Sequence, residues 1–204
     1  MIGVIDMGVG NLRSVIKAIE YLGLKAVLTT SKNTIKKSKV IVLPGVGSFD
    51  RGMKGLEERG IKDTLIDEVL NGKPFLGICL GMQLLFEKSE EGRKNGLGLI
   101  KGNVRGFRGK NLKIPHMGWN EVIIKREQRK IFEGIPDKSF FYFVHSYYCV
   151  PEDKSLILTE TKYGVHFASS ICKNNIIATQ FHPEKSGVIG LKFLKNFFKM
   201  VGCL

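Results

Sequence analysis

The 204-residue sequence predicts an α/β fold with a mainly parallel central sheet flanked by helices and with added antiparallel strands in the C-terminal half. Two observations lead to this prediction. In the first half, short apolar runs alternate with segments that carry apolar residues at helical spacing, as in repeated strand–helix units. In the second half, short runs rich in β-branched and aromatic residues follow one another with turns between them. The length suits one domain over residues 1–204.

The first half supplies the parallel strands. Residues 2–6 and 40–43 are largely apolar, as strands buried on both faces should be. Segments between such runs repeat apolar residues every three or four positions, which indicates helices, and Gly23 caps the first of them. We therefore expect strands at residues 2–6, 25–29, 40–43 and 74–78, and helices at residues 12–22, 50–57 and 61–71.

The turn after the first strand contains Gly8 and Gly10, which resembles the start of a dinucleotide-binding loop. Arg13 stands where that loop needs its third glycine, and Thr29-Thr30 stand where an acidic residue should end the second strand. The sequence therefore argues against a dinucleotide cofactor.

The second half supplies strands that either extend the sheet or form a smaller one. We expect them at residues 97–100, 121–125, 139–144, 155–161, 165–172 and 175–180. The last helix is expected at residues 187–200, because apolar side chains recur there at helical spacing. Its buried stripe would be Val188, Leu191, Leu194, Phe197 and Phe198.

Composition excludes several classes of protein. Hydrophobic residues make up 43% of the chain, and no apolar stretch approaches the roughly 20 residues of a membrane-spanning helix. The N-terminal residues lack a signal peptide, so we expect a cytoplasmic protein without a membrane partner. The four cysteines are scattered, which predicts free thiols and no metal site.

The net charge of +13 raises nucleic-acid binding as an alternative. The bases fall in short clusters without the interleaved aromatic residues that a stacking surface needs. We therefore expect a lysine-rich solvated surface and no nucleic-acid partner, with steering of anionic substrates or of an acidic protein as a further option. The clusters are Lys36, Lys37 and Lys39; Lys125, Arg126, Arg129 and Lys130; and Lys192, Lys195 and Lys199.

The segment Gly77-Ile78-Cys79-Leu80-Gly81 has the spacing of a nucleophile elbow, with a cysteine in place of serine. It joins the strand at residues 74–78 to a helix expected to start near Met82. Glycine suits both flanks because a β-carbon there would collide with the neighbouring backbone. A helix N-terminus favours thiolate over thiol. Cys79 is therefore a candidate nucleophile, although a buried structural cysteine is also compatible with this segment alone.

A base and an orienting acid follow the last predicted strand, in Phe181-His182-Pro183-Glu184. Pro183 stiffens this segment, so that Glu184 can reach one imidazole nitrogen of His182. The other nitrogen is then free to take a proton from a thiol. Cys79, His182 and Glu184 would form a catalytic triad.

Acyl transfer by a cysteine also needs N–H donors for the oxyanion. Leu80 follows the nucleophile and offers one donor. Pro44-Gly45-Val46-Gly47 ends a strand expected to lie beside the strand at 74–78, so the backbone near Val46 and Gly47 offers a second.

Three segments together resemble the signatures of the class I glutamine amidotransferases. They are Pro44 to Phe49, Gly77 to Gln83 and Gln180 to Glu184, and they span the chain in the family's order. The family hydrolyses glutamine at a Cys–His–Glu triad, passes ammonia to a synthase and uses no metal or organic cofactor. Pro115 to Asn120 and Phe143 to Tyr147 are most similar to members that form the glutaminase half of a two-subunit synthase in histidine biosynthesis.

The resemblance implies further roles, position by position. Gln83, Ser146 and Tyr147 would hold glutamine, and Val46, Gly47 and Leu80 would surround the oxyanion. The partner would be a (β/α)₈-barrel cyclase subunit in a heterodimer. Four residues would lie toward it, namely Asn11, Trp119, Tyr142 and Lys185.

Structural interpretations remain open for several of these residues. Trp119 could belong to the core, Tyr142 and Tyr147 could pack on a sheet, and His116 and His145 could be structural. Two other functions remain as alternatives within enzymes: a paralogous glutaminase that serves a sugar-modifying synthase, and a cysteine peptidase or deglycase. A nucleic-acid-binding module is the alternative among binding proteins.

Overall fold

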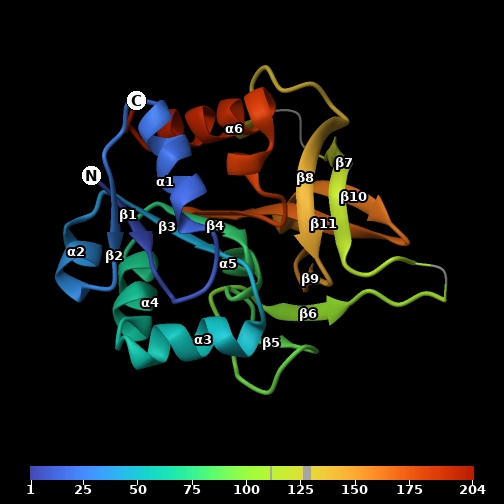
Figure 1. Ribbon diagram of the computed structural model, residues 1–204, viewed down its shortest axis with the longest axis horizontal. Helices are drawn as coiled ribbons and strands as arrows, with labels where there is room; N and C mark the ends of the chain where they lie inside the picture. The colour runs from blue at the N-terminus through green and yellow to red at the C-terminus, as the bar shows by residue number, and fades with distance from the viewer. Residues whose placement is uncertain (111, 126–129) are drawn as a thin grey trace.

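A computed structural model describes residues 1–110, 112–125 and 130–204, so Arg126 and Arg129 lie outside the described residues (Figure 1). Among the described residues a nine-stranded sheet runs in the order β2-β1-β3-β4-β12-β11-β10-β7-β8. The bounds of these strands, in chain order, are β1 Ile2–Ile5, β2 Ala26–Thr29, β3 Val40–Gly45, β4 Phe75–Cys79, β7 His116–Ile124, β8 Ser139–His145, β10 Ile157–Tyr163, β11 Val165–Lys173 and β12 Ile176–Thr179.

Parallel pairing is confined to one end of the sheet. β1 pairs in parallel with β2 and β3, β3 with β4, and β4 with β12. Gly45 at the end of β3 lies opposite Cys79 at the end of β4. The other neighbours, from β12 to β8, pair antiparallel. The predicted combination of a parallel sheet with antiparallel additions is confirmed.

Helices cover both faces of the sheet. α1 (Leu12–Tyr21) and α6 (Gly187–Met200) lie on one face, and α3 (Phe49–Glu58) and α4 (Lys62–Leu70) lie on the other (Figure 1). Successive residues of a strand point to opposite faces. Accordingly, Val42 of β3 belongs to the buried cluster that contains Val15 and Phe193, while Leu43 belongs to the one that contains Leu56 and Leu65.

A second, three-stranded sheet lies beside the large one. It consists of β5 (Lys88–Ser89), β6 (Gly102–Gly106) and β9 (Tyr147–Pro151), with β6 between a parallel and an antiparallel neighbour. β6 and β9 were not predicted, nor were the short helix α2 (Lys32–Lys37) and the first half of β7.

The expected strand at residues 97–100 is wrong. Leu97, Leu99 and Ile100 are buried, but their segment is an irregular loop. Its backbone bonds to the stretch after the elbow: the N–H of Leu97 donates to the carbonyl of Leu84 at 2.8 Å, and that of Ile100 to the carbonyl of Leu85 at 3.0 Å. The apolar run at residues 97–100 therefore indicates burial and does not indicate strand pairing. No helix in the described parts of the chain is long and apolar enough to cross a membrane.

Candidate active site

Cys79 ends β4 in a backbone conformation that side chains rarely adopt, with φ 53°. The turn is held by close contacts of two glycines. A β-carbon at Gly77 would lie 2.9 Å from the carbonyl oxygen of Gly81, and one at Gly81 would lie 1.7 Å from the carbonyl oxygen of Leu43. Strain of this kind is typical of functional sites and persists where the surroundings enforce it. The predicted steric reason for both glycines holds.

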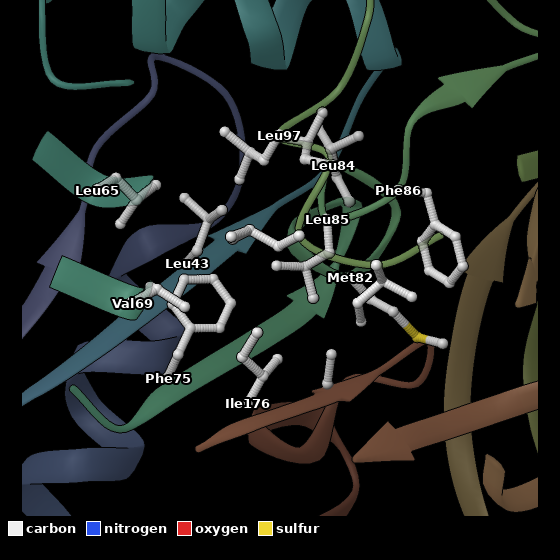
Figure 2. Close-up of a cluster of buried hydrophobic side chains, with 14 of the residues drawn as sticks. Leu43, Leu65, Val69, Phe75, Met82, Leu84, Leu85, Phe86, Leu97 and Ile176 are labelled. Carbon is white, nitrogen blue, oxygen red and sulfur yellow. The ribbon is translucent and has the colours of Figure 1, made fainter. Parts of the chain in front are cut away.

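The helix after the elbow is much shorter than expected. α5 spans only Leu80–Gln83, and the chain then turns. Met82, Leu84, Leu85 and Phe86 point into the same buried cluster as Leu43 and Phe75 (Figure 2). The apolar run that suggested a longer helix instead anchors the elbow in the core between the sheet and α3.

His182 follows β12, the strand beside β4, and is paired with Glu184. Nδ1 of His182 lies 2.8 Å from Oε1 of Glu184, and both side chains are 3% exposed. Pro183 begins a short 3₁₀ helix, Pro183–Lys185, which carries Glu184 back toward the imidazole.

The other imidazole nitrogen is left for the cysteine. Nε2 of His182 is buried without a hydrogen-bond partner among the described residues. Burial acts to lower the pKa of His182, but the charge of Cys79, the contact with its sulfur and the hydrogen bond with Glu184 outweigh burial. The pKa of His182 therefore lies above its ordinary value. These effects require that the Cys79 sulfur lies close to the imidazole of His182.

Two buried glutamines connect Cys79 by hydrogen bonds to the backbone of Tyr147. Nε2 of Gln180 donates to the sulfur of Cys79 at 3.5 Å. Gln83 donates from its own Nε2 to Oε1 of Gln180 at 3.1 Å and to the carbonyl of Tyr147 at 3.0 Å. Sequence reasoning assigned a substrate-binding role to Gln83 and none to Gln180, which begins the signature segment Gln180 to Glu184.

A cavity of about 340 Å³ opens beside the cysteine. Most of the predicted substrate and oxyanion residues line it together, although they come from distant parts of the chain. The lining is Gly47, Ser48, Cys79, Leu80, Gln83, Glu91, Pro115, Val144, His145, Ser146 and Tyr147. Val46 is the predicted oxyanion residue that does not line the cavity. Gly47 has φ 133°, which glycine adopts readily, so this residue turns the chain between β3 and α3.

Glu91 was not predicted from the sequence. Its carboxylate accepts a hydrogen bond from the N–H of Phe49 at 2.7 Å, at the start of α3. Burial raises the pKa of Glu91, against the opposing effect of that hydrogen bond. A lone glutamate in a polar, glycine-flanked loop gives no sequence signal, since only the fold brings it to the cavity.

Three of the four residues expected to face a partner, Trp119, Tyr142 and Lys185, lie close together. Trp119 is 56% exposed, so the interpretation as a core tryptophan is wrong. Its ring lies 6.2 Å from that of Tyr142, directly opposite on β8, and Nζ of Lys185 lies 5.8 Å from the Tyr142 ring. Asn11 is exposed at the start of α1.

Apolar side chains extend this surface. Met117 is 61% exposed and Phe140 is 53% exposed, on the outward faces of β7 and β8. Large exposed apolar groups that gather in this way mark interaction sites. The inward faces of the same strands carry His116 and His145, which are buried as the structural interpretation expected.

Among the described residues, no cluster of three or more potential ligands is placed to hold a metal ion. His166, to which the sequence assigned no role, is exposed on β11. Cys79, Cys149 and Cys203 carry free thiols.

Comparison with known proteins defines the class. Residues 3–201 match the family model described as glutamine amidotransferase class-I. The chain belongs to this family, as its elbow and histidine segments suggested.

Within the family, the chain is similar over its whole length to proteins named imidazole glycerol phosphate synthase subunit HisH. It is 49% identical to the one from Caldanaerobacter subterraneus subsp. tengcongensis, with all of both chains covered. It is 52% identical to that of Aquifex aeolicus, over 95% of this chain and 94% of the relative, and 50% identical to that of Methanocaldococcus jannaschii, over 98% and 100%.

Solved structures with lower identity share the fold. A crystal structure titled as a glutamine amidotransferase superposes with a TM-score of 0.75 at 19% identity, covering 98% of each chain. PurLQS from Thermotoga maritima gives a TM-score of 0.74 at 18% identity, covering 98% of this chain and 97% of that one. The α/β architecture is therefore that of glutamine amidotransferases.

Proposed function

We propose that this chain is the glutaminase subunit of imidazole glycerol phosphate synthase. It would hydrolyse L-glutamine to glutamate and ammonia as one domain over residues 1–204. The observation that carries the proposal is the meeting of Cys79 with a glutamate-paired histidine beside a cavity of about 340 Å³. Family membership and relatives near 50% identity support the same reaction.

The chemistry follows from the positions of the three groups. Nε2 of His182 takes the thiol proton while the Cys79 sulfur attacks the side-chain amide carbon of glutamine. The tetrahedral intermediate collapses, the C–N bond breaks, and the imidazolium returns its proton to the departing ammonia. Water, deprotonated by His182, then cleaves the thioester to release glutamate and restore the thiol. Glu184 holds the tautomer and stabilises the imidazolium.

The oxyanion would be held by backbone N–H groups. Leu80 offers one at the start of α5, and the turn at Val46 and Gly47 offers the second. Gly45 pairs with Cys79 across β3 and β4, which keeps this turn beside the reacting sulfur. Loss of one such donor typically costs about 10²–10³-fold in rate.

Glutamine would bind along the cavity wall through Gln83, Ser146 and Tyr147. Its α-ammonium needs an anion, and Glu91 is the carboxylate in the cavity lining. Binding of a cation would favour the ionised form of Glu91 and offset the effect of its burial. The reaction requires no metal or organic cofactor.

The partner would be a (β/α)₈-barrel cyclase subunit that uses the ammonia to make imidazole glycerol phosphate and AICAR. It would dock in the cytoplasm on the surface of Trp119, Tyr142 and Lys185, with Asn11 at its border. Exposed aromatic rings with an adjacent cation are typical of binding hot spots.

The direct test is ammonia release from glutamine, measured with and without the barrel subunit encoded in the same genome. We expect weak turnover from the isolated chain, strong stimulation by the barrel, and loss of both in Cys79→Ala. Wild-type turnover by Cys79→Ala would refute the triad. High turnover without the barrel would argue against the histidine pathway, and stimulation only by a sugar-modifying synthase would favour the paralogous function.

A further inference from the structure

A continuous chain of hydrogen bonds leads from the partner-facing strand β7 to the wall of the glutamine cavity. Nδ2 of Asn120 lies 3.1 Å from Nε2 of His116, and Nδ1 of His116 lies 2.8 Å from Nε2 of His145. Nδ1 of His145 lies 2.8 Å from the carbonyl oxygen of Tyr147. Asn120 directly follows Trp119, whereas His145 and Tyr147 line the cavity.

The donor and acceptor groups fix the direction of every hydrogen bond in this series. The Tyr147 carbonyl can only accept, so Nδ1 of His145 carries hydrogen, and its Nε2 accepts from Nδ1–H of His116. Nε2 of His116 then accepts from Asn120. The Asn120 amide also donates to the carbonyl of Lys162 at 3.1 Å, which confirms the orientation of its nitrogen. Both imidazoles are therefore neutral Nδ1–H tautomers.

The surroundings keep both imidazoles neutral. His116 stacks on Tyr163 with ring centroids 4.0 Å apart and on Phe143 at 4.9 Å. Burial lowers the pKa of His116 to about 4 and that of His145 to about 3, with a smaller opposing effect from the Tyr147 carbonyl on His145. Reversing the donor and acceptor of one hydrogen bond would require reversing the others or adding a proton. The series of hydrogen bonds therefore has discrete arrangements and no intermediate ones.

The chain continues to the reacting sulfur. The Tyr147 carbonyl accepts a second hydrogen bond from Nε2 of Gln83, at 3.0 Å, which donates in turn to Gln180 at 3.1 Å. Gln180 then donates to the sulfur of Cys79 at 3.5 Å. Both hydrogens of the Gln83 amide are thereby used, so its oxygen is left to accept a hydrogen bond from a ligand in the cavity.

We propose that His116 and His145 are positioning residues that couple docking of a partner on β7 to the orientation of the Tyr147 carbonyl and Gln83 in the glutamine cavity. This inference rests on the proposed function, because it concerns how the partner regulates that same site. A movement of β7 would reach the cavity through these hydrogen bonds, because each of them has a fixed donor and a fixed acceptor.

The test removes the hydrogen-bond donor on β7, where the series of hydrogen bonds begins. Asn120→Asp keeps the shape of the side chain, but a carboxylate cannot donate to His116. The stimulated and the partner-free rates of glutamine hydrolysis are measured with the barrel at a saturating concentration, determined by titration for each variant. We expect the ratio of the two rates to fall about 2- to 30-fold, the range that networks of this kind produce, while partner-free turnover changes less than twofold.

The matched control is Asn103→Asp, the same change at an exposed position of β6 that takes no part in this series of hydrogen bonds. It should leave the ratio of the stimulated rate to the partner-free rate unaltered. A ratio like that of the wild type in Asn120→Asp would overturn the coupling, as would a parallel loss of both rates, the result of a purely structural role. Absence of stimulation in the wild type would instead count against the proposed function.

Nitrogen NMR of the imidazoles gives an independent readout. Both His116 and His145 should appear as neutral Nδ1–H tautomers in the wild type, and Asn120→Asp should convert His116 to the Nε2–H or doubly protonated form. His116→Phe keeps the stacking on Tyr163 but removes both hydrogen bonds, so it should lower the stimulation ratio as well. Nε2–H tautomers in the wild type, or full stimulation in His116→Phe, would refute the inference.

Discussion

The two ends of the large sheet contribute different things to the site and are held by different forces. At the parallel end, the groups that would react follow three adjacent strands: Gly47 after β3, Cys79 at the end of β4 and His182 after β12. Ligands of open α/β sheets bind at such carboxyl ends. At the antiparallel end, β7 and β8 carry the exposed aromatic surface, and the end of β8 supplies part of the cavity wall. The start of β9, in the second sheet, continues that wall.

The forces differ accordingly. The elbow at the parallel end is set by steric contact, since Gly77 and Gly81 have no room for a β-carbon. The antiparallel wall is set by buried side-chain hydrogen bonds through His116 and His145. The parallel end should therefore respond most to changes in volume, and the antiparallel end to changes in polarity, protonation and partner binding.

The largest effect is expected from removal of the base at the parallel end. His182→Ala should lower the partner-stimulated kcat for glutamine hydrolysis about 10⁴- to 10⁶-fold, because loss of one member of a triad costs nearly as much as loss of all. The exposed His166 provides the control, and His166→Ala should keep full activity. A decrease of less than tenfold in His182→Ala would mean that another group is the base.

Next comes a steric comparison between the two ends. Gly81→Ala would place its β-carbon 1.7 Å from a backbone oxygen, so the free energy of unfolding should fall by at least about 3 kcal/mol. Gly118 of β7 has φ 131° but open space around it, so Gly118→Ala should cost only the backbone strain, about 1–2 kcal/mol. Urea unfolding measures both, and equal losses would remove the distinction between the ends.

The partner-facing surface should show its effect only in the complex. Trp119→Ala is expected to weaken binding of the barrel by about 2–4 kcal/mol, as truncation of a central aromatic does, with the partner-free rate unchanged. Leu70 is 71% exposed on α4 and gives the control, since Leu70→Ala should bind normally. Calorimetric titration decides the question, and equal affinities would place the interface elsewhere.

The smallest effect concerns acid stability of the antiparallel end. The folded-state pKa values of His116 and His145 are lowered to about 4 and about 3. Below the unfolded value near 6.5, the unfolded chain therefore binds protons that the native chain does not, and stability falls as pH falls. From pH 6.5 to 5 the free energy of unfolding should decrease by roughly 2–4 kcal/mol.

Other groups contribute little to that window. His182, whose pKa is raised, is protonated in the native state and only partly protonated in the unfolded state near pH 6.5, so it acts weakly in the opposite direction. Glu91, whose pKa is also raised, acts weakly in that same opposite direction. Urea unfolding at the two pH values measures the change, and His116→Gln should reduce it. A free energy that stays constant over this range in the wild type would contradict neutral buried imidazoles.

Sequence patterns predicted the parallel end well because its strands are apolar runs and its glycines serve local geometry. Local sequence was enough to predict the strand at 74–78 and the elbow at Cys79. It also predicted that the segment from Pro44 to Gly47 ends a strand beside the strand at 74–78. The last helix was also predicted, from its apolar spacing, but Val188 of its expected buried stripe is wrong, since that side chain is 81% exposed in the first turn of α6. The pattern failed at residues 97–100, where burial in an irregular loop mimics a strand.

The rest of the site depends on contacts that no local pattern encodes. Glu91 reaches the cavity only because its loop folds back to the start of α3. Gln180 joins the site only because β12 lies beside β4, which brings it to Cys79 and Gln83. The pairing of His116 with His145 depends on the register of β7 and β8, in which these residues lie opposite one another. A smaller sheet was one expected option, but its strands β5 and β6 escaped prediction because they are short and polar.

The most direct test of the central claim is covalent capture of the nucleophile. The complex with the barrel is incubated with a glutamine analogue that carries an electrophile at the amide position, and the chain is examined by intact mass and peptide mapping. We predict one adduct, on Cys79, which excess glutamine prevents and which His182→Ala forms far more slowly. An adduct on the buried Cys149, or none on Cys79 while glutamine is still hydrolysed, would contradict the account.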